Sequence, residues 1–380
     1  MLRLRRTLAI ALKESRQIRR DRRTLGLLLF VPALMLSLYG YALTFDVKHI
    51  AVAVLDHDQS PASRQFVQGL FRSEYFEEVG RLASEAEADE WLDAGRARAV
   101  LVVPPQFGER LEQGRPAQVQ ALVDGANASS ASITVGYLEG HAREYSLARV
   151  AARLERLGLP LPETPLAVET RVWYNPALET SQFLVPGLVG FLLMVIGAVT
   201  TSLSVVREKE RGTLEQVVVS AARPAEFLVG KALPYLLICL CAEALILLAA
   251  VFLFAVPVRG SLGWLFLVSV VYLLGALGFG LLISTVAQTQ QVAFQVATMA
   301  SMLPSMLLSD LIFPIESMPR LLQGLTYVVP ARHFIAVIRG IVLKGAGPEA
   351  WATELAILAA FAAVMLAVAS RRLAQLMRRG

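Results

Sequence analysis

The sequence has 380 residues, of which 55% are hydrophobic and only 18% are charged, and its formal net charge is +5. Soluble globular proteins contain about 25% charged residues, so the composition excludes an ordinary soluble protein and indicates an integral membrane protein. The two cysteines, Cys239 and Cys241, both fall in one apolar run, where we expect small apolar filler and neither a disulfide nor a metal site.

The N-terminal arm, residues 1–23, mixes apolar side chains with many arginines, as expected of an amphipathic helix lying among lipid headgroups. Residues 24–45 follow as a first membrane span, since about 20 apolar residues cross a bilayer core. The span is too long for a signal peptide and lacks a small-residue cleavage site, which favours an uncleaved anchor. Because the C-terminal tail is also basic, the positive-inside rule predicts that both termini are cytoplasmic.

Residues 46–181 have the patterning of a soluble domain and are far too many for a connecting loop. This segment carries a net charge of −7, against +12 for the rest of the chain, which suits translocation to the outer side. Asn127 is expected to begin a long amphipathic helix that ends near Leu157. The predicted strands, separated by helices at 63–71 and 85–92, are Ile50–Leu55, Ala99–Val103, Val119–Val123 and Val168–Tyr174. We therefore predict a mixed α/β extracytoplasmic domain.

Residues 182–380 are predicted to hold five more spans, joined on the outer side by a re-entrant segment at 314–348 that prolines interrupt. Four basic residues in that segment argue mildly against this topology, but the charges beside the first span outweigh them. The five spans are Leu184–Val206, Leu233–Val256, Gly263–Ala287, Val292–Ile315 and Ala350–Ser370. The predicted fold is an α-helical polytopic membrane protein with six transmembrane helices and an α/β domain inserted between helices 1 and 2.

A charged segment at 207–216 stands directly between two spans, a placement that suggests a lever at the membrane surface. Its acidic and basic side chains alternate, which favours docking into a polar groove over a stop-transfer patch, since the latter would contain Lys and Arg alone. The candidate lever residues are Arg207, Glu208, Lys209, Glu210, Arg211, Gly212, Thr213 and Glu215.

Two acids, Glu243 and Asp310, fall within or near apolar runs, where ionised groups are costly and often face a path. They are candidates for a translocation path, with a local interhelical hydrogen bond for Glu243 and interfacial water for Asp310 as the alternatives. Catalytic motifs are missing from the sequence. Gly230 and Lys231 form a Gly-Lys pair, but Ala232 follows where a phosphate loop needs Ser or Thr. We expect no catalytic, cofactor-binding or metal-binding residues.

Several motifs in order resemble the membrane permease subunit of type-2 ABC transporters, the exporter class with six helices and a large outer domain after the first. They are REKERGTLEQ at 207–216, RPAEFLVGKALPY at 223–235, FPIESMP at 313–319, LTYVVPARHF at 325–334 and RGIVLKG at 339–345. Together with the topology they cover essentially the whole chain. Asp310 departs from the family, which commonly has Gly before the aromatic and Phe-Pro element.

The resemblance implies that 207–216 is a coupling helix contacting a separate phosphate-loop ATPase subunit, which would bind ATP and Mg. It also implies a second permease copy or a paralogue, and allows a periplasmic membrane-fusion adaptor, although a self-contained lid is an equal alternative for the outer domain. The predicted function is export of apolar or amphipathic small molecules across the bacterial inner membrane. The alternative is a non-transporting sensor or scaffold. The basic arm needs only anionic lipid, and no nucleic acid, as its partner.

Overall fold

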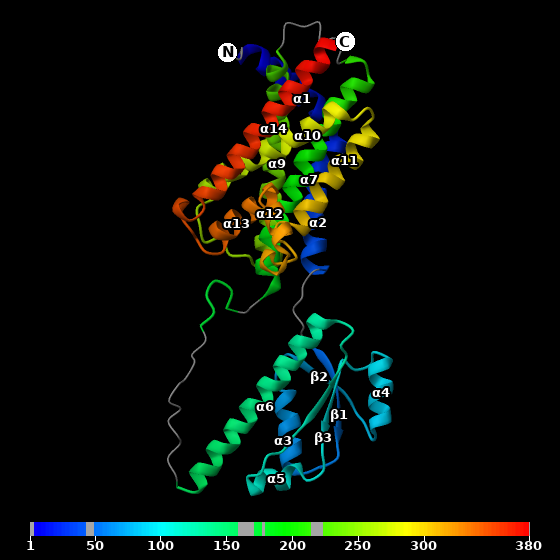
Figure 1. Ribbon diagram of the computed structural model, residues 1–380, viewed down its shortest axis with the longest axis vertical. Coiled ribbons are helices and arrows are strands. Elements are labelled where there is room, and N and C mark those ends of the chain that lie inside the picture. The colour runs from blue at the N-terminus through cyan, green and yellow to red at the C-terminus, as the bar shows by residue number, and fades with distance from the viewer. Residues whose placement is uncertain (1–3, 43–48, 159–170, 177–178, 214–222, 380) are drawn as a thin grey trace. The chain divides into compact units, whose positions relative to one another are not determined.

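The computed structural model describes residues 4–42, 49–158, 171–176, 179–213 and 223–379. The chain divides into two compact units, one formed by residues 45–170 and the other by 1–44 together with 171–380 (Figure 1). The second unit is helical.

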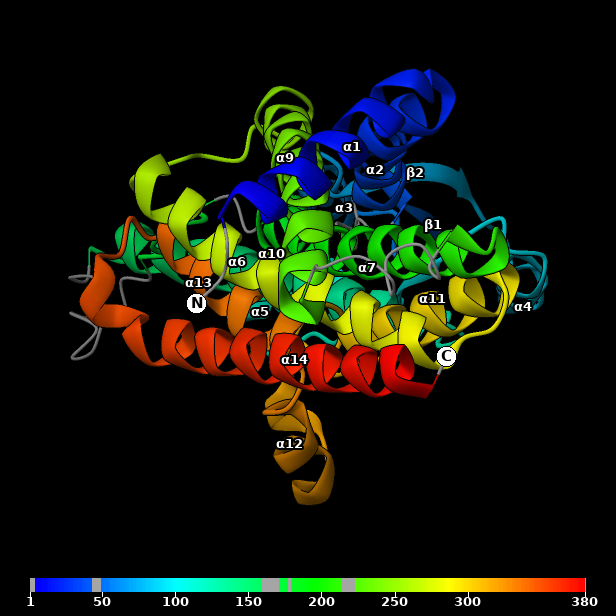
Figure 2. The same ribbon diagram turned by 90° about the horizontal axis from the view of Figure 1, so that it is seen from above.

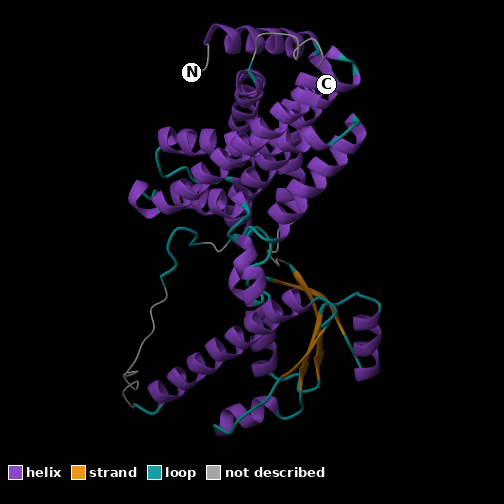
Figure 3. Ribbon diagram, turned by 45° about the horizontal axis from the view of Figure 1, so that its top comes forward, coloured by secondary structure: helices purple, strands orange, loops and turns teal. Residues whose placement is uncertain are grey.

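The α/β unit is built on a four-stranded sheet of order β2-β1-β3-β4, in which β4 alone runs antiparallel to its neighbour. The central strands β1 and β3 are apolar except for Asp56 at the end of β1, because helices cover both faces of the sheet. Figure 3 shows the strands between the helices. The elements are β1 Ile50–Asp56, α3 Pro61–Leu70, β2 Phe76–Arg81, α4 Glu85–Asp93, β3 Ala99–Val103, α5 Phe107–Gln113, β4 Gln120–Val123 and α6 Ala128–Arg156.

Helix α6 begins as expected, with the Asn127 side chain accepting a hydrogen bond from the backbone N–H of Ser130. Strand β2 and helix α5 were not predicted, since FEEVGR in β2 lacks a clear apolar alternation. The predicted strand at 168–174 is wrong for its described part. Residues 171–174 belong to the helical unit and form no strand there, because Tyr174 takes a left-handed φ of 71° that an extended strand does not allow.

The helical unit is organised around α7, Thr180–Glu210, which contacts α2, α9, α10, α11 and α13. In the view from above in Figure 2, the long α14 is seen along its whole length, and it packs against α10. The helices of the unit are α1 Leu4–Arg20, α2 Arg22–Ala42, α7 Thr180–Glu210, α9 Pro224–Phe254, α10 Leu262–Val286, α11 Gln290–Leu307, α12 Arg320–Thr326, α13 Pro330–Val342 and α14 Ala352–Arg379, with short 3-10 turns at Ile315–Ser317 and Pro348–Ala350.

Close approach of backbones fixes α10 against α7. A side chain at Gly280 would collide with the carbonyl oxygen of Ala198, and one at Gly197 would meet Ala276 at 2.9 Å. The Thr201 hydroxyl donates to the carbonyl of Leu277 across the same contact, at 3.0 Å. Small residues and such hydrogen bonds are the usual basis of helix association in lipid, where the hydrophobic effect does not drive it.

Five described helices are long and apolar enough to cross a membrane, namely α2, α7, α9, α10 and the first part of α14. The predicted span at 292–315 does not match one of them. Its helix, α11, ends at Leu307 and carries Gln290, Gln291 and Gln295 in its first turns, so its apolar content is lower. The bent pair α12 and α13, with 77° between its helices, supplies the sixth candidate as a broken span or a re-entrant loop.

Candidate coupling site

The predicted lever begins as the last turn of α7 rather than as a separate helix. Residues Arg207–Glu210 continue the long helix, which then ends at Arg211, and Gly212 takes a left-handed φ of 69°. A glycine in this conformation is the common way for a helix to stop, because it carries no side chain that would clash. Residues 214–222, including Glu215, lie outside the described part of the chain.

Consecutive side chains of this last turn bind different helices. The Lys209 ammonium donates to the carbonyl of Ala287, just beyond the end of α10, at 3.0 Å. The Glu210 carboxylate accepts the backbone N–H of Gln290 at 2.7 Å, at the start of α11 where helix N–H groups need acceptors. Arg207 donates to the side-chain oxygen of Gln290 at 3.4 Å. The alternating charges are therefore used within the chain.

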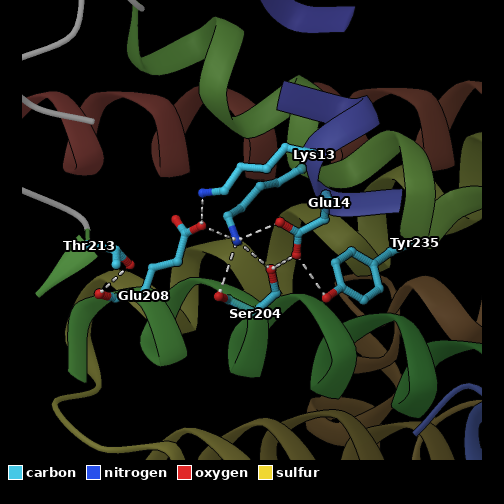
Figure 4. A network of polar contacts seen from close by, with 7 residues as sticks. Lys13, Glu14, Ser204, Glu208, Thr213 and Tyr235 are labelled. Atoms are coloured by element: carbon cyan, nitrogen blue, oxygen red, sulfur yellow. Dashed lines mark hydrogen bonds and ion pairs between the residues drawn. The ribbon is translucent and has the colours of Figure 1, made fainter. Parts of the chain in front are cut away.

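Glu208 joins the same turn to a buried polar cluster, which we define as Lys13, Glu14, Ser204, Glu208, Lys231 and Tyr235 (Figure 4). One Glu208 oxygen lies 3.0 Å from the Lys13 ammonium and 3.4 Å from that of Lys231. The other Glu208 oxygen is buried without a hydrogen-bond partner among the described residues.

Lys231 lies at the centre of the cluster and is 1% exposed. Its ammonium lies 3.2 Å from a Glu14 oxygen, and donates to the Ser204 hydroxyl at 2.8 Å and to the Ser204 carbonyl at 3.2 Å. The second Glu14 oxygen accepts from Ser204 and from the Tyr235 hydroxyl, each at 3.0 Å. A buried charge without such partners would be strongly unfavourable, so these contacts explain how a Lys and a Glu can occupy an apolar interior.

The cluster holds α1 against α9. Helix α1 buries Thr7, Ala11 and Glu14, which follow the spacing of one helix face, whereas its leucines and most arginines stay exposed. Gly230 permits the approach, since a side chain there would meet Ile10 at 2.8 Å. The Gly-Lys pair that fails as a phosphate loop is thus an interhelical contact.

A small cavity of about 70 Å³ adjoins the cluster between α1, α2, α7 and α9, with Glu14, Thr200, Arg207 and Tyr235 in its wall. Asp21, also in the wall, links α1 to α2 and accepts hydrogen bonds from the hydroxyl and the backbone N–H of Thr24. These two bonds lower the pKa of Asp21 below its ordinary value.

The two predicted path acids lie apart from the cluster and from each other. Glu243 is buried on α9, where it accepts a hydrogen bond from Ser269 of α10, as the alternative interpretation expected. Asp310 follows α11 and pairs with Arg339 of α13 at 2.9 Å. Its φ of 65° is one that Gly adopts freely and Asp tolerates. Whether either acid lines a path stays a prediction.

The sequence pattern did not predict that Glu14 and Lys231 belong to the site. Glu14 is the only acid among the first 20 residues, which the positive-inside count treats as one basic arm. Its position on the face of Thr7 and Ala11 was a usable signal, because an ionised group on a buried face needs a buried partner.

A sequence profile described as "ABC-2 family transporter protein" matches residues 22–371 of the chain. The chain belongs to this family. This ABC-2 permease is 36% identical to the probable multidrug ABC transporter permease YbhS of Escherichia coli over 342 residues, which are 90% of this chain and 89% of YbhS. It is 34% identical to the probable multidrug ABC transporter permease YbhR of the same organism, over 88% of this chain and 89% of YbhR.

A more distant relative is ABC transporter G family member 20 of Dictyostelium discoideum, 26% identical over 93% of this chain but over only 48% of its own length. The ABC-2 permease is therefore a multi-pass membrane protein of a transporter family whose members named here are transport permeases and ABC transporters.

Proposed function

We propose that this ABC-2 permease is the membrane subunit of an ATP-driven exporter and that a separate phosphate-loop ATPase, which binds ATP and Mg, acts on it through segment 207–216. The observation that carries the proposal is the set of bonds made by the last turn of α7. Through Glu208, Lys209 and Glu210, that turn connects to α1, α9, α10 and α11. A force applied just beyond it would reach most of the helical unit.

The proposed contact with the ATPase begins at Arg211 and Gly212. Arg211 and Gly212 are exposed, and Thr213 is held to the α7 carbonyl of Glu208 at 3.2 Å. ATP binding must favour one arrangement of the helices over the other, since a ligand that binds both equally shifts no equilibrium.

In the proposed topology both termini and the end of α7 face the cytoplasm of a bacterium, the α/β unit lies outside, and the bent pair α12–α13 is re-entrant from the outer side. The arrangement within the helical unit supports this, because α1, the end of α7 and the end of α14 lie at one end of the bundle (Figure 1). The exposed face of α1, with its many arginines, would lie against anionic lipid headgroups.

The proposed cargo is apolar or amphipathic, and Glu243 and Asp310 stay candidates for its path. Both acids are held by partners, Ser269 and Arg339, so few fixed charges would be left to solvate an ion. The relatives YbhS and YbhR carry names of probable multidrug permeases. Because six spans form half of a transporter, we also propose a second copy or a paralogue as partner, and for the α/β unit either a membrane-fusion adaptor or a role as a lid.

The test is co-purification of the tagged permease with the phosphate-loop ATPase encoded by the neighbouring reading frame, followed by reconstitution into vesicles with an apolar fluorescent dye. We expect a stable complex whose ATP hydrolysis drives dye movement. Purification of the permease with a kinase or protease instead, and no dye movement with ATP, would show that the function is sensing.

A further inference from the structure

Three helices meet at one ammonium group in the polar cluster. Lys231 comes from α9, its carboxylate partner Glu14 from α1, and its partners Ser204 and Glu208 from the last two turns of α7. Of the elements that bind the end of α7, α1 and α9 are joined to it by this buried network. By contrast, α10 and α11 are joined to it by the partly buried Lys209 and the exposed Glu210.

The bonds of the network are directional and their number leaves little freedom. Both oxygens of Glu14 are engaged, one by Lys231 and the other by Ser204 and Tyr235. Sliding or rotating α1 along α9 would break at least one of these charge-assisted bonds in a buried place. Apolar contacts alone would resist such sliding less, because the hydrophobic effect is non-directional.

We propose that Glu14 and Lys231 are positioning residues of energy coupling: they make α1, the end of α7 and α9 move as one rigid block when the ATPase acts. The inference rests on the proposed function and adds the residues through which the movement is transmitted. Lys13 closes the cluster at its exposed edge. The Lys13 ammonium pairs with the second carboxylate of the cluster, that of Glu208. Because Lys13 and Glu14 both belong to α1, the cluster contains two basic and two acidic side chains only while α1 is docked.

Replacing both charged side chains of the pair by uncharged ones distinguishes a role in transmitting the movement from a role in stability. Removing one member of a buried pair leaves an uncompensated charge, but replacing both members by uncharged side chains of similar volume is often neutral for stability. The variant Glu14→Gln/Lys231→Met therefore keeps the shape and loses the bonds made by the Lys231 ammonium. A control is Arg16→Gln/Leu233→Met, which introduces the same two residue types at exposed positions of α1 and α9.

The experiment measures dye transported per ATP hydrolysed by the reconstituted complex, together with its unfolding temperature. We expect the neutral double variant to unfold near the parent temperature and to hydrolyse ATP, with about tenfold less transport per ATP, a factor that corresponds to losing one charged hydrogen-bond network. The control should equal the parent. An unfolding temperature near the parent's with an unchanged ratio of transport to hydrolysis would overturn the inference.

If the double variant fails to assemble, Tyr235→Phe takes its place, since it removes only the hydroxyl that donates to Glu14. A fall of about threefold in transport per ATP is then expected, and no fall would overturn the inference. A parent complex that transports nothing with ATP overturns the proposed function and the inference together, whereas parent transport with unaffected variants overturns the inference alone.

Discussion

The stability of the buried pair gives the sharpest quantitative prediction. In Lys231→Met, Glu14 loses the one cation that pairs with it among the described residues, while Glu208 keeps Lys13 at 3.0 Å. Glu14 is 3% exposed, so its carboxylate recovers little hydration unless the α1–α9 contact opens. Removing one partner of a buried pair costs about 3–5 kcal/mol. Adding Glu14→Gln should recover most of this loss, because the amide can still bond Ser204 and Tyr235.

The assay is equilibrium unfolding of the purified permease in a denaturing detergent, with Lys13→Met as the matched control. The Lys13 side chain is 58% exposed, so its loss should cost no more than about 1 kcal/mol. The reasoning is refuted if Lys231→Met alone is as stable as the double variant, since the Glu14 carboxylate would then not depend on the ammonium.

Three further predictions concern other parts of the chain. Gly280→Ala should destabilise the α7–α10 contact by about 1–3 kcal/mol, whereas Gly26→Ala in α2, with nothing within 4 Å of the added carbon, should not; equal unfolding of the two would contradict the close approach. Exchanging the charges at Glu210 and Arg211 should uncouple ATP use from transport while the protein still folds, because the bond from Gln290 to Glu210 is lost; unchanged transport would count against the lever. In the α/β unit, the N–H of Ala126 and then Arg98 hold the pKa of Asp124 below 3.8. A carboxylate whose pKa is lowered by folding stabilises the folded state at pH values above its unfolded pKa, and this stabilisation is lost as the pH falls through the folded pKa. Hydrogen exchange of this turn in Asp124→Asn should therefore differ from that of the parent at neutral pH and converge with it well below pH 3.8.

Much of the fold follows from local pattern. The apolar runs of α7, α9 and α10 and the strands β1, β3 and β4 can be predicted directly from the sequence, because each is mainly apolar and is bounded by charges or turn residues. Strand β2 was missed because its central residues Glu77 and Glu78 are exposed at a sheet edge, which leaves no periodic signal. At 292–315 the apolar composition was read as one span, although the helix ends at Leu307 and Asp310 beyond it takes a left-handed φ.

The sequence predicted where the candidate coupling site lies but not the contacts that its side chains make. The charge pattern of 207–216 located the segment, but not that Glu208, Lys209 and Glu210 bind inside the chain, because their partners lie between 23 and 195 positions away in sequence. Glu14 and Lys231 are separated by 217 positions, and each is unremarkable alone. Such long-range pairs depend on tertiary packing, which the local pattern of the sequence does not reveal.

The central claim is that an ATPase contacts the chain just beyond α7, and a cysteine at Arg211 tests it most directly. The residue is exposed, and the background would carry Cys239→Ala and Cys241→Ala so that the new thiol is unique. We predict that a membrane-impermeant maleimide labels Arg211→Cys in inverted membrane vesicles and that a thiol crosslinker joins it to the ATPase subunit. Labelling only in right-side-out vesicles, with no crosslink to the ATPase, would contradict the account.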